Sequence, residues 1–420
     1  MLVIRPFRGI TYNQERISDL GKVVAPPYDV ISTSGQKEYY QLHPYNIIRI
    51  ILGKEYPGDD DKENKYTRAA KYFKEWLSSG ILKRDSQAAI YVYEQEYPLK
   101  GKVKRRRGFI ALMKLEEFGS GVVFPHERTF PQAKLDRLKL LRCCRANLSS
   151  IFSLYSDPSY LVDKYLEKTT PSFALRDKDG VRHLLGAIRD TDIIERIVEA
   201  MKDKKIFIAD GHHRYLTALK FREEERTQTG EENFVMMYFL NMEADVLTIL
   251  PVHRVIGNLG LEEGLQLRKK LSDFFQIETF DFVPETEKAE MEEMFRQIQE
   301  AKDGYIFGMY CGERRYYLLS LKESYRQDFK GRVNTAVLDE LMTKRILKKK
   351  GQIDFVKDER RAVNLVREGK YQAAFFLKPP SLRQIKEVAL SDGVMPPKSS
   401  YFYPKLLSGL VMRELNPDLF

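Results

Sequence analysis

The sequence has few of the residues that build disulfides and zinc sites: its 420 residues include three cysteines and six histidines. Cys143 and Cys144 are adjacent, which makes an ordinary disulfide between them geometrically awkward, and Cys311 is distant in the chain. No C-x-x-C pair is present, which argues against a zinc ribbon and a redox dithiol. The three cysteines are therefore expected to be unremarkable thiols in a reducing compartment.

Long hydrophobic runs are also missing. No run of about 18 apolar residues, the length that spans a bilayer, occurs in the sequence. The first twenty residues, MLVIRPFRGITYNQERISDL, reach Arg5 and Arg8 before an apolar segment of signal-peptide type can form. We therefore expect a cytoplasmic protein with no membrane span.

The formal net charge is +10, from 70 lysines and arginines against 60 acidic residues. The basic residues are dispersed, and their densest run is KGKVKRRRGF at residues 100–109. It lies between two strand-like stretches, AAIYVYEQEY and GFIALMKLEEF, so it predicts a basic hairpin tip. Nucleic acid is an alternative partner for such a run. The positive balance equally suits a site for anionic small molecules.

At about 150 residues for each domain, the length predicts two or three domains or one large elaborated domain. Alternating strand-like and helix-like patterns without an internal repeat favour an α+β fold, with mixed sheets and flanking helices. We place the boundaries near residues 155 and 260. They give an N-terminal α+β region (1–155), a core (156–260) and a C-terminal α+β region (261–420).

The strongest local pattern is KIFIADGHHRYLTALKF at residues 205–221. A short buried strand is expected to end at Asp210, and a helix is expected to follow. Gly211 lets the backbone approach a ligand closely, and the first turn of the helix offers unpaired N–H groups and partial positive charge. Arg214 adds a fork of donors that suits phosphate. Together with His212 and His213, which donate hydrogen bonds or take protons, the turn predicts a phosphate site.

Three other loops are candidates for the same site. PHERT offers Glu127 as a general base and Arg128 as an anion clamp. The other two loops supply hydroxyls and charged groups. They are APPYDV, with Tyr28 and Asp29, and MPPKSS, with Lys398, Ser399 and Ser400. His43 and His183 are expected at the surface or in turns, without a function.

Metal binding is the main alternative for the histidines. His126, His212, His213 and His253 each follow or begin a predicted strand, and zinc takes three or four such ligands. Adjacent residues in a helix point about 100° apart, so His212 and His213 are poorly placed to share one ion. A magnesium ion bridged by phosphates needs few protein ligands, and Asp210 is its candidate ligand.

Several motifs, in order from Arg5 to Lys405, resemble the bacterial and archaeal family named domain of unknown function 1015. They are RPFRG, APPYDV, PHERTF with Asp136-Arg137 beyond it, NLSSIFSLY, ADGHHRY, LPVHRV and MPPKSSYFYPK. Ser150 stands where that family usually has proline, and Ser400 where it usually has threonine, which keeps the hydroxyl.

The DGHHR string also resembles the nucleotide-binding turn of the ParB/sulfiredoxin superfamily, which includes free-serine kinases. This resemblance implies a ParB/sulfiredoxin-like nucleotide-binding core in which Gly211, His212, His213 and Arg214 hold phosphates. It further implies that Asp210 positions metal or nucleotide and that Glu127 activates a hydroxyl. Sulfiredoxin chemistry itself is excluded, because a histidine occupies the place of the required cysteine.

These observations predict an enzyme, a nucleotide-dependent kinase of a small hydroxylated metabolite, with free L-serine as the first candidate. Glu127, His213 and Asp210 would be catalytic, and Gly211, His212, His213, Arg214 and Lys398 would bind the nucleotide. The donor, ATP or ADP, and the oligomeric state stay open, and Mg²⁺ is the expected metal. The alternatives are a ParB-like nucleotide switch or nucleic-acid-binding protein, and a metal-dependent hydrolase.

Overall fold

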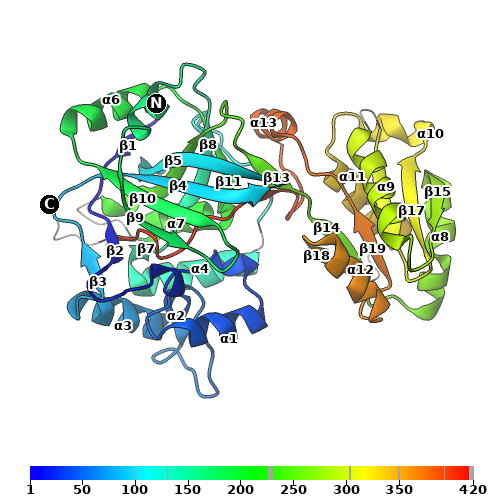
Figure 1. Ribbon diagram of the computed structural model, residues 1–420, viewed down its shortest axis with the longest axis horizontal. Coiled ribbons are helices and arrows are strands. Elements are labelled where there is room, and N and C mark those ends of the chain that lie inside the picture. The colour runs from blue at the N-terminus through cyan, green and yellow to red at the C-terminus, as the bar shows by residue number, and fades with distance from the viewer. Residues whose placement is uncertain are drawn as a thin grey trace. The chain divides into compact units, whose positions relative to one another are not determined.

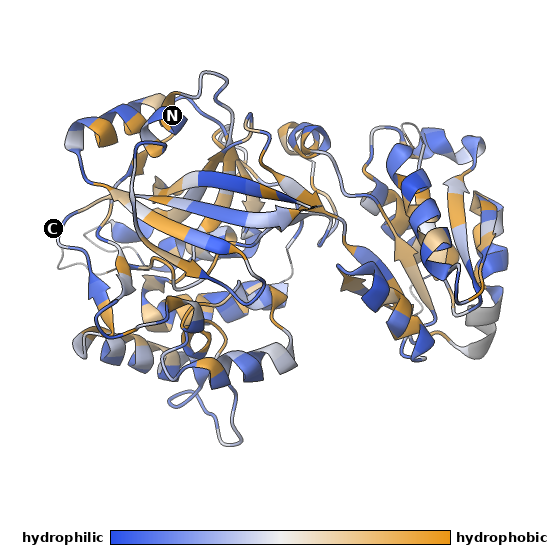
Figure 2. Cartoon of the chain, viewed as in Figure 1, coloured by the Kyte–Doolittle hydropathy of each residue, from blue (hydrophilic) through white to orange (hydrophobic). Residues whose placement is uncertain are grey.

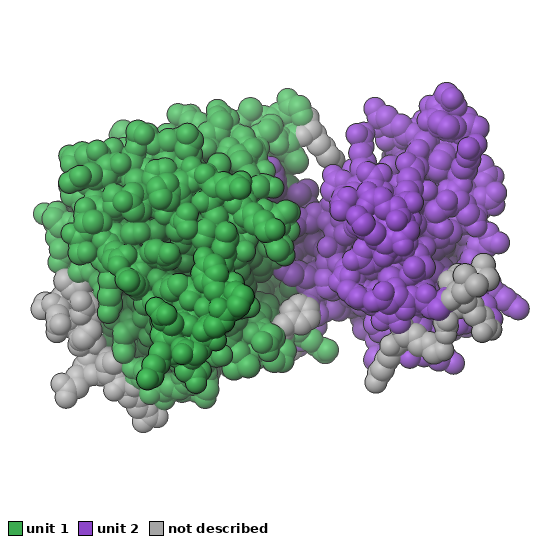
Figure 3. Space-filling view, turned by 90° about the horizontal axis from the view of Figure 1, so that it is seen from below, with its two compact units in different colours: residues 1–248, 404–420 green, residues 249–403 purple. Residues whose placement is uncertain are grey.

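The structure is a computed structural model that describes residues 1–99, 101–129, 131–225, 230–301, 304–348, 351–391 and 393–415, without the side chains of 261–265. The chain divides into two compact units (Figure 3). Unit 1 comprises residues 1–248 and 404–420, and unit 2 comprises residues 249–403. Residues on both sides of position 155 thus belong to unit 1, and unit 2 begins at Ile249.

Unit 1 is built around a nine-stranded mixed sheet (Figure 1). Its path is β6 (Val123–Phe124), β11 (Ile206–Asp210), β8 (Ile151–Tyr155), β12 (Phe234–Asn241), β5 (Lys102–Lys114), β4 (Ile90–Leu99), β10 (Arg182–Ile188) and β9 (Pro171–Arg176), and β1 (Ile4–Arg5) pairs with β5. The pairs β6–β11 and β8–β12 are parallel, and the others are antiparallel. The expected mixed sheet with flanking helices is confirmed.

Helices and two small sheets complete unit 1. The helices are α1 (Thr33–Leu42), α2 (Ile48–Ile51), α3 (Lys65–Ser78), α4 (Pro131–Cys144), α5 (Leu161–Leu166), α6 (Thr191–Met201) and α7 (His212–Glu224). Short 3₁₀ turns cover Leu20–Lys22, Tyr28–Val30 and Glu231–Asn233. The small sheets pair β2 (Ile10–Tyr12) with β3 (Leu82–Arg84), and β7 (Ala146–Asn147) with β21 (Arg413–Glu414).

Local sequence explains the helix ends. Asn64 caps α3 in a capping box with Thr67, which satisfies two backbone donors reciprocally. The side chain of Asp190 caps α6 by accepting from the backbone N–H of Ile193, and the buried face of α6 carries Ile194, Ile197 and Met201. Such a face gains most of its stability from packing on the sheet.

One face of the large sheet forms the main core of unit 1 with helices α5, α6 and α7. Side chains such as Val92 on β4, Phe109 on β5 and Phe239 on β12 are 5% exposed or less and pack with Ile197 of α6 and Tyr215 of α7. The central strand β12 is apolar on both faces, as expected for a strand covered on both sides.

The C-terminal segment runs past the other side of β4 and β5, and it is drawn in red in Figure 1. The side chain of Gln95 donates to the carbonyl of Lys405, and the buried guanidinium of Arg106 donates to that of Pro404. The backbone N–H of Leu407 donates to the hydroxyl of Tyr93. These contacts hold a segment that is distant in sequence against the middle of the sheet.

The basic run forms the beginning of β5 in the β4–β5 hairpin, where Figure 2 shows hydrophilic residues (blue) giving way to hydrophobic ones (orange). Glu94 forms ion pairs with Arg105 and Arg107, each at 2.5 Å. Arg106 is fully buried and donates to Gln95. The three arginines therefore have partners within unit 1.

Unit 2 contains a six-stranded antiparallel sheet with helices on both faces. Its strands, in order, are β15 (Phe275–Asp281), β17 (Arg315–Leu321), β16 (Ile306–Tyr310), β19 (Ala373–Phe376), β14 (His253–Gly257) and β18 (Gln352–Val356). Its helices are α8 (Leu261–Phe274), α9 (Glu287–Glu300), α10 (Glu323–Arg326), α11 (Asn334–Glu340), a π-helical turn (Leu341–Ile346), α12 (Glu359–Arg367) and α13 (Leu382–Leu390). A further pair joins β13 (Thr248–Leu250) to β20 (Tyr401–Tyr403).

The structure places His183 differently from the sequence prediction. His183 is fully buried on β10, so its expected place at the surface was wrong. Its Nδ1 lies 2.7 Å from the Tyr93 hydroxyl and its Nε2 lies 3.0 Å from Asp177, which satisfies both ring nitrogens.

Among the described residues, no helix combines the length and the apolar character needed to cross a membrane.

Candidate functional site

The predicted turn connects β11 to α7. Gly211 adopts a left-handed conformation with φ of 96° and ends the strand at the helix N-terminus. A Cβ atom at this position would lie 2.9 Å from the guanidinium of Arg214. Glycine is therefore required both by the backbone and by the close approach of the arginine. The first-turn amides of α7, from His212 onward, have no acceptor within the helix.

Asp210 lies where the pairing of β11 with β8 slips by one residue. Ile208 pairs with Ser153, whereas Asp210 pairs with Phe152, so Ala209 is the extra residue of a bulge. A bulge redirects the side chains that follow it. Here it places the Asp210 carboxylate between two cations: Arg214 donates to Oδ2 at 2.8 Å, and the ammonium of Lys405 binds Oδ1.

This cluster is largely buried. The side chains of Lys405, Arg214 and Asp210 are 8%, 15% and 16% exposed. Two cations, Arg214 and Lys405, thus lie beside the helix N-terminus, whose dipole is also positive. The arrangement can therefore stabilise an anion.

Arg214 also ties the turn to the start of β8. Its Nη1 donates to the Ser149 hydroxyl at 3.1 Å and to the Ser150 carbonyl. Both serines come from the NLSS stretch. Arg214 thus connects α7 to two other segments, and its guanidinium is held by hydrogen bonds to Ser149, Ser150 and Asp210.

The parallel pairing of β6 with β11 brings the PHE stretch to the same edge of the sheet. Phe124, the last residue of β6, pairs with Phe207, and β11 continues to Asp210. Beyond them the backbone N–H of His126 donates to Nε2 of His212 at 3.3 Å, and the two rings meet edge to face at 4.7 Å. The structure therefore joins two of the predicted loops.

His126 and His212 are both neutral at neutral pH. Burial lowers the pKa of His126 to about 4. Burial also lowers the pKa of His212 well below 6.5, and the neighbouring His126, His213, Lys405 and Arg214 add to this effect. Because Nε2 of His212 accepts a hydrogen bond, its proton resides on Nδ1. The ring can therefore donate one hydrogen bond to a phosphate, through Nδ1, and it carries no positive charge.

The other predicted residues are placed as follows. Glu127 is half-buried and directly follows His126, one residue from the contact with the turn. His213 is half-buried in the first turn of α7. Lys398 belongs to unit 2, where its carbonyl accepts from Arg254 at 3.0 Å. Its role at the DGHHR turn stays a prediction.

The predicted metal ligands are only partly brought together. His253 lies in unit 2, where its Nδ1 accepts from the backbone N–H of Leu377. Within the described part of the chain, no group of three His, Cys, Asp or Glu side chains could hold a metal ion. Both oxygens of the Asp210 carboxylate bind a cation, Arg214 or Lys405, and its metal role stays a prediction.

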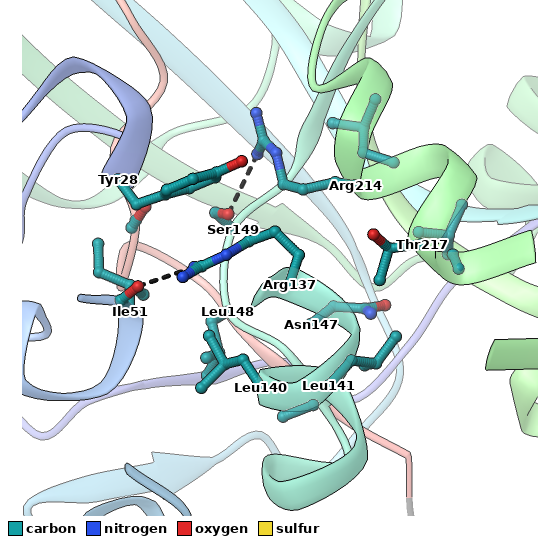
Figure 4. A pocket seen from close by; sticks show the side chains of 15 residues that line it. Tyr28, Ile51, Arg137, Leu140, Leu141, Asn147, Leu148, Ser149, Arg214 and Thr217 are labelled. Atoms are coloured by element: carbon teal, nitrogen blue, oxygen red, sulfur yellow. Dashed lines mark hydrogen bonds between the residues drawn. The ribbon is translucent and has the colours of Figure 1, made fainter. Parts of the chain in front are cut away.

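Sequence reasoning did not find Lys405, Arg137 and Ser149 as parts of the site. Lys405 was visible only as the last residue of the string MPPKSSYFYPK, without any sign of its partner. Arg137 lies on α4 with its guanidinium 3.8 Å above the ring centroid of Tyr28. Arg137 and Ser149 line a cavity beside Arg214 (Figure 4). Tyr28, proposed from APPYDV, lines it too.

Comparison with solved structures finds only distant similarity. A free serine kinase in complex with AMP has 14% identity and a TM-score of 0.36, covering 67% of this chain and 83% of that one. A conserved hypothetical protein from Pyrococcus furiosus has 14% identity and a TM-score of 0.37, covering 71% and 94%. SbnI from Staphylococcus aureus, with a C-terminal truncation, has 11% identity and a TM-score of 0.37, covering 71% and 85%. These scores are too low to carry an argument about activity.

Sequence comparison is more decisive. No curated protein matches the chain. The family described as protein of unknown function (DUF1015) matches residues 4–343, which cover most of the sequence and include the PHE and DGHHR stretches. The chain belongs to the DUF1015 family.

Proposed function

We propose that the protein is a nucleotide-dependent phosphotransferase that phosphorylates a small hydroxylated metabolite. The observation that carries the proposal is the cluster at the start of α7. There, a left-handed Gly211 opens the helix beside two cations, Arg214 and Lys405, that share one carboxylate. Helix N-termini with adjacent basic groups bind phosphate, and the neutral His126–His212 pair adds no negative charge.

The proposed roles follow from phosphoryl transfer, which depends on positioning and charge neutralisation. The amides after Gly211 and the Arg214 guanidinium would hold the phosphates, with His212 and His213 as further donors. Asp210 would orient Arg214 and Lys405. Glu127 would take the proton of the acceptor hydroxyl, whose oxygen forms the new bond to phosphorus while the donor nucleotide leaves with one phosphate fewer.

ATP and ADP are the donors proposed, together with Mg²⁺. A magnesium ion carried by the nucleotide needs few protein ligands, in keeping with an Asp210 carboxylate already held by two cations. L-Serine, the acceptor expected from the sequence resemblance, is the first hydroxyl compound to test. Lys398 is retained as a proposed nucleotide contact.

The test is a thermal-shift and calorimetric titration of the full chain with ATP, ADP and pyrophosphate, each with Mg²⁺. A ligand that binds the native state raises the melting temperature in proportion to ln(1 + [L]/Kd). We expect a shift with wild type that Arg214→Ala abolishes and Arg214→Lys retains in part, since lysine keeps the charge but not the fork of donors.

The matched control is Lys220→Ala. Lys220 lies on the same helix, is exposed and pairs with Glu223, so this change removes one positive charge away from the turn. Circular dichroism of each variant verifies its folding. Equal nucleotide binding by wild type and a folded Arg214→Ala would refute the phosphate assignment.

A further inference from the structure

A cavity in unit 1 adjoins the turn but is distinct from the helix N-terminus. Arg214 belongs to both, because it binds Asp210 and also lines the cavity with Tyr28 and Arg137. The cavity volume is about 70 Å³. At roughly 10–15 Å³ for each ordered water, it has room for about five to seven waters. It is therefore too small for a nucleotide, but it fits an organic molecule with about as many non-hydrogen atoms as those waters.

The lining separates into an apolar wall and a polar side (Figure 4). Leu140, Leu141 and Leu148 lie together on the apolar wall. On the opposite side the hydroxyl of Tyr28 points toward the guanidinium of Arg214. Such a division suits a ligand with a short carbon chain and one strongly polar end.

Two donors in the lining have no partner within the described residues, one on the polar side and one beside the leucines (Figure 4). The hydroxyl of Tyr28 has no hydrogen-bond partner there, although burial raises its pKa to about 12 and keeps it protonated. The amide oxygen of Asn147 accepts from Met236 and Arg413, whereas its Nδ2 has no partner among the described residues. An anionic group on the polar side would accept a hydrogen bond from the Tyr28 hydroxyl.

The charge around the cavity selects an anion. Among the described residues, its lining includes Arg137 and Arg214 but no aspartate or glutamate. Each arginine shares its carboxylate partner with a lysine: Arg137 and Lys65 bind Asp136, and Arg214 and Lys405 bind Asp210. Each carboxylate thus binds two cations, and the two arginines are the charged side chains that the described lining brings to the cavity.

From these features we infer that the cavity binds a small carboxylate, of about five to seven non-hydrogen atoms, that carries no ammonium group. An amino acid would place its ammonium among cations with no acidic partner in the described lining, which costs desolvation without compensation. A 2-hydroxy acid puts a hydroxyl in that place. The carboxylate would accept from Tyr28 and Arg214.

The position beside Arg214 gives this ligand a role as phosphoryl acceptor. That role rests on the proposed function, whereas binding of the carboxylate does not. If transfer occurs at the turn, the acceptor is a hydroxy acid in place of L-serine. The inference therefore narrows the acceptor class and disagrees with the first candidate from the sequence.

The experiment uses two pairs of ligands that differ only in hydroxyl against ammonium: L-glycerate with L-serine, and L-lactate with L-alanine. Each is titrated calorimetrically into the full chain without nucleotide, and inorganic phosphate forms a fifth arm. We expect at least one hydroxy acid to bind about tenfold or more tightly than its amino-acid partner. Tyr28→Phe should weaken that binding about tenfold, as expected for loss of one hydrogen bond to a charged group.

The control is Tyr165→Phe, which removes a hydroxyl from a half-buried tyrosine of α5 that does not line the cavity. It should leave the affinity unchanged. Because the Tyr28 hydroxyl has no partner among the described residues, Tyr28→Phe should fold normally, and its melting temperature checks this. Amino acids binding as tightly as hydroxy acids, phosphate binding more tightly than both, or no carboxylate binding would each overturn the inference.

Repeating the nucleotide titrations on the same samples separates the two proposals. Nucleotide binding without carboxylate binding would overturn the cavity assignment alone. Carboxylate binding that depends on Tyr28, without any nucleotide binding, would remove the proposed phosphotransferase and leave the carboxylate site standing.

Discussion

Lys405 and Asp210 form a largely buried ion pair although 195 residues separate them in the chain. The pair fastens the C-terminal segment to the turn that opens α7, on the carboxylate that also binds Arg214. The same C-terminal segment crosses β4 and β5 and is held there through its backbone. The candidate phosphate site is therefore completed by the last part of unit 1.

Removing the Lys405 ammonium should destabilise the fold. We expect Lys405→Met to lower the free energy of unfolding by about 3 kcal/mol, because it leaves the largely buried Asp210 carboxylate without one of the cations that offset its desolvation. Urea denaturation measures the change. Arg142→Ala is the control, because Arg142 and Glu224 form a more exposed pair worth at most about 1 kcal/mol. Adding Asp210→Asn to Lys405→Met should recover part of the loss, and strictly additive losses would contradict the pairing.

Gly211→Ala should disturb the turn in two ways. The left-handed backbone costs about 1–2 kcal/mol for a residue with a side chain, and the new methyl group would displace the Arg214 guanidinium. Gly58→Ala separates these effects, because Gly58 has nearly the same φ, 98°, and a Cβ added there would meet no atom within 4 Å. Both variants should lose stability, but only Gly211→Ala should lose nucleotide affinity in calorimetry. Equal nucleotide affinity in the two variants would show that the position of Arg214 does not matter for binding.

Stability should fall as the pH drops below the ordinary histidine range. The pKa of His126 is lowered from 6.5 to about 4 in the folded state, so between these values the unfolded chain binds the proton and the folded chain does not. The free energy of unfolding is therefore highest above pH 6.5, where both states have a neutral His126. It falls progressively toward pH 4, by about 3 kcal/mol for His126 alone. His212 adds to the same trend, since burial also lowers its pKa well below 6.5.

The prediction is tested by the urea concentration at the midpoint of unfolding, measured between about pH 7.5 and 4.5, the range in which histidine titrates. His126→Gln should flatten the profile relative to wild type, and the difference between the two profiles removes the contribution of His253, whose pKa is also about 4. Parallel profiles for wild type and His126→Gln would contradict the assignment of a neutral His126.

Glu127→Gln should separate binding from turnover. The change removes the proposed base and keeps the shape of the side chain, so nucleotide affinity should stay within about twofold while kcat falls about 10²–10⁴-fold. Phosphate transfer is followed by nucleotide turnover with the hydroxy acids and L-serine as acceptors. The control is Glu117→Gln, which neutralises a more exposed glutamate paired with Arg222. Unchanged turnover in Glu127→Gln would exclude Glu127 as the base.

Several features of the site were predictable because local sequence controls them. The apolar run that ends at Asp210, the glycine that permits positive φ and the helical pattern after it predicted the strand, turn and helix in order. The β4–β5 hairpin followed in the same way from two flanking strand patterns, but the expected place of the basic run at its tip was wrong, because residues Lys102 to Arg107 pair with β4 inside β5. Membership of the DUF1015 family was visible in the spaced motifs.

The partners of these elements were not predictable from local patterns. β12 carries apolar or aromatic side chains on both faces as far as Leu240, so its side-chain pattern does not choose which strands lie beside it. The meeting of His126 with His212 depends on the parallel pairing of β6 and β11. His183 was misplaced for the same reason: its burial comes from β4 and the contacts with Tyr93 and Asp177.

The chemistry that the turn can offer is encoded locally, because the conformation of Gly211 and the unpaired first-turn amides of α7 arise within a few residues. The charges that surround the turn come from the packing of distant segments. The order of strands in the sheet and the path of the C-terminal segment bring Lys405, Ser149 and Arg137 to Arg214, and the cavity exists only after α4, α7 and β8 have packed together. Contacts between distant segments are set by the surfaces that the whole unit buries, and no local spacing encodes them.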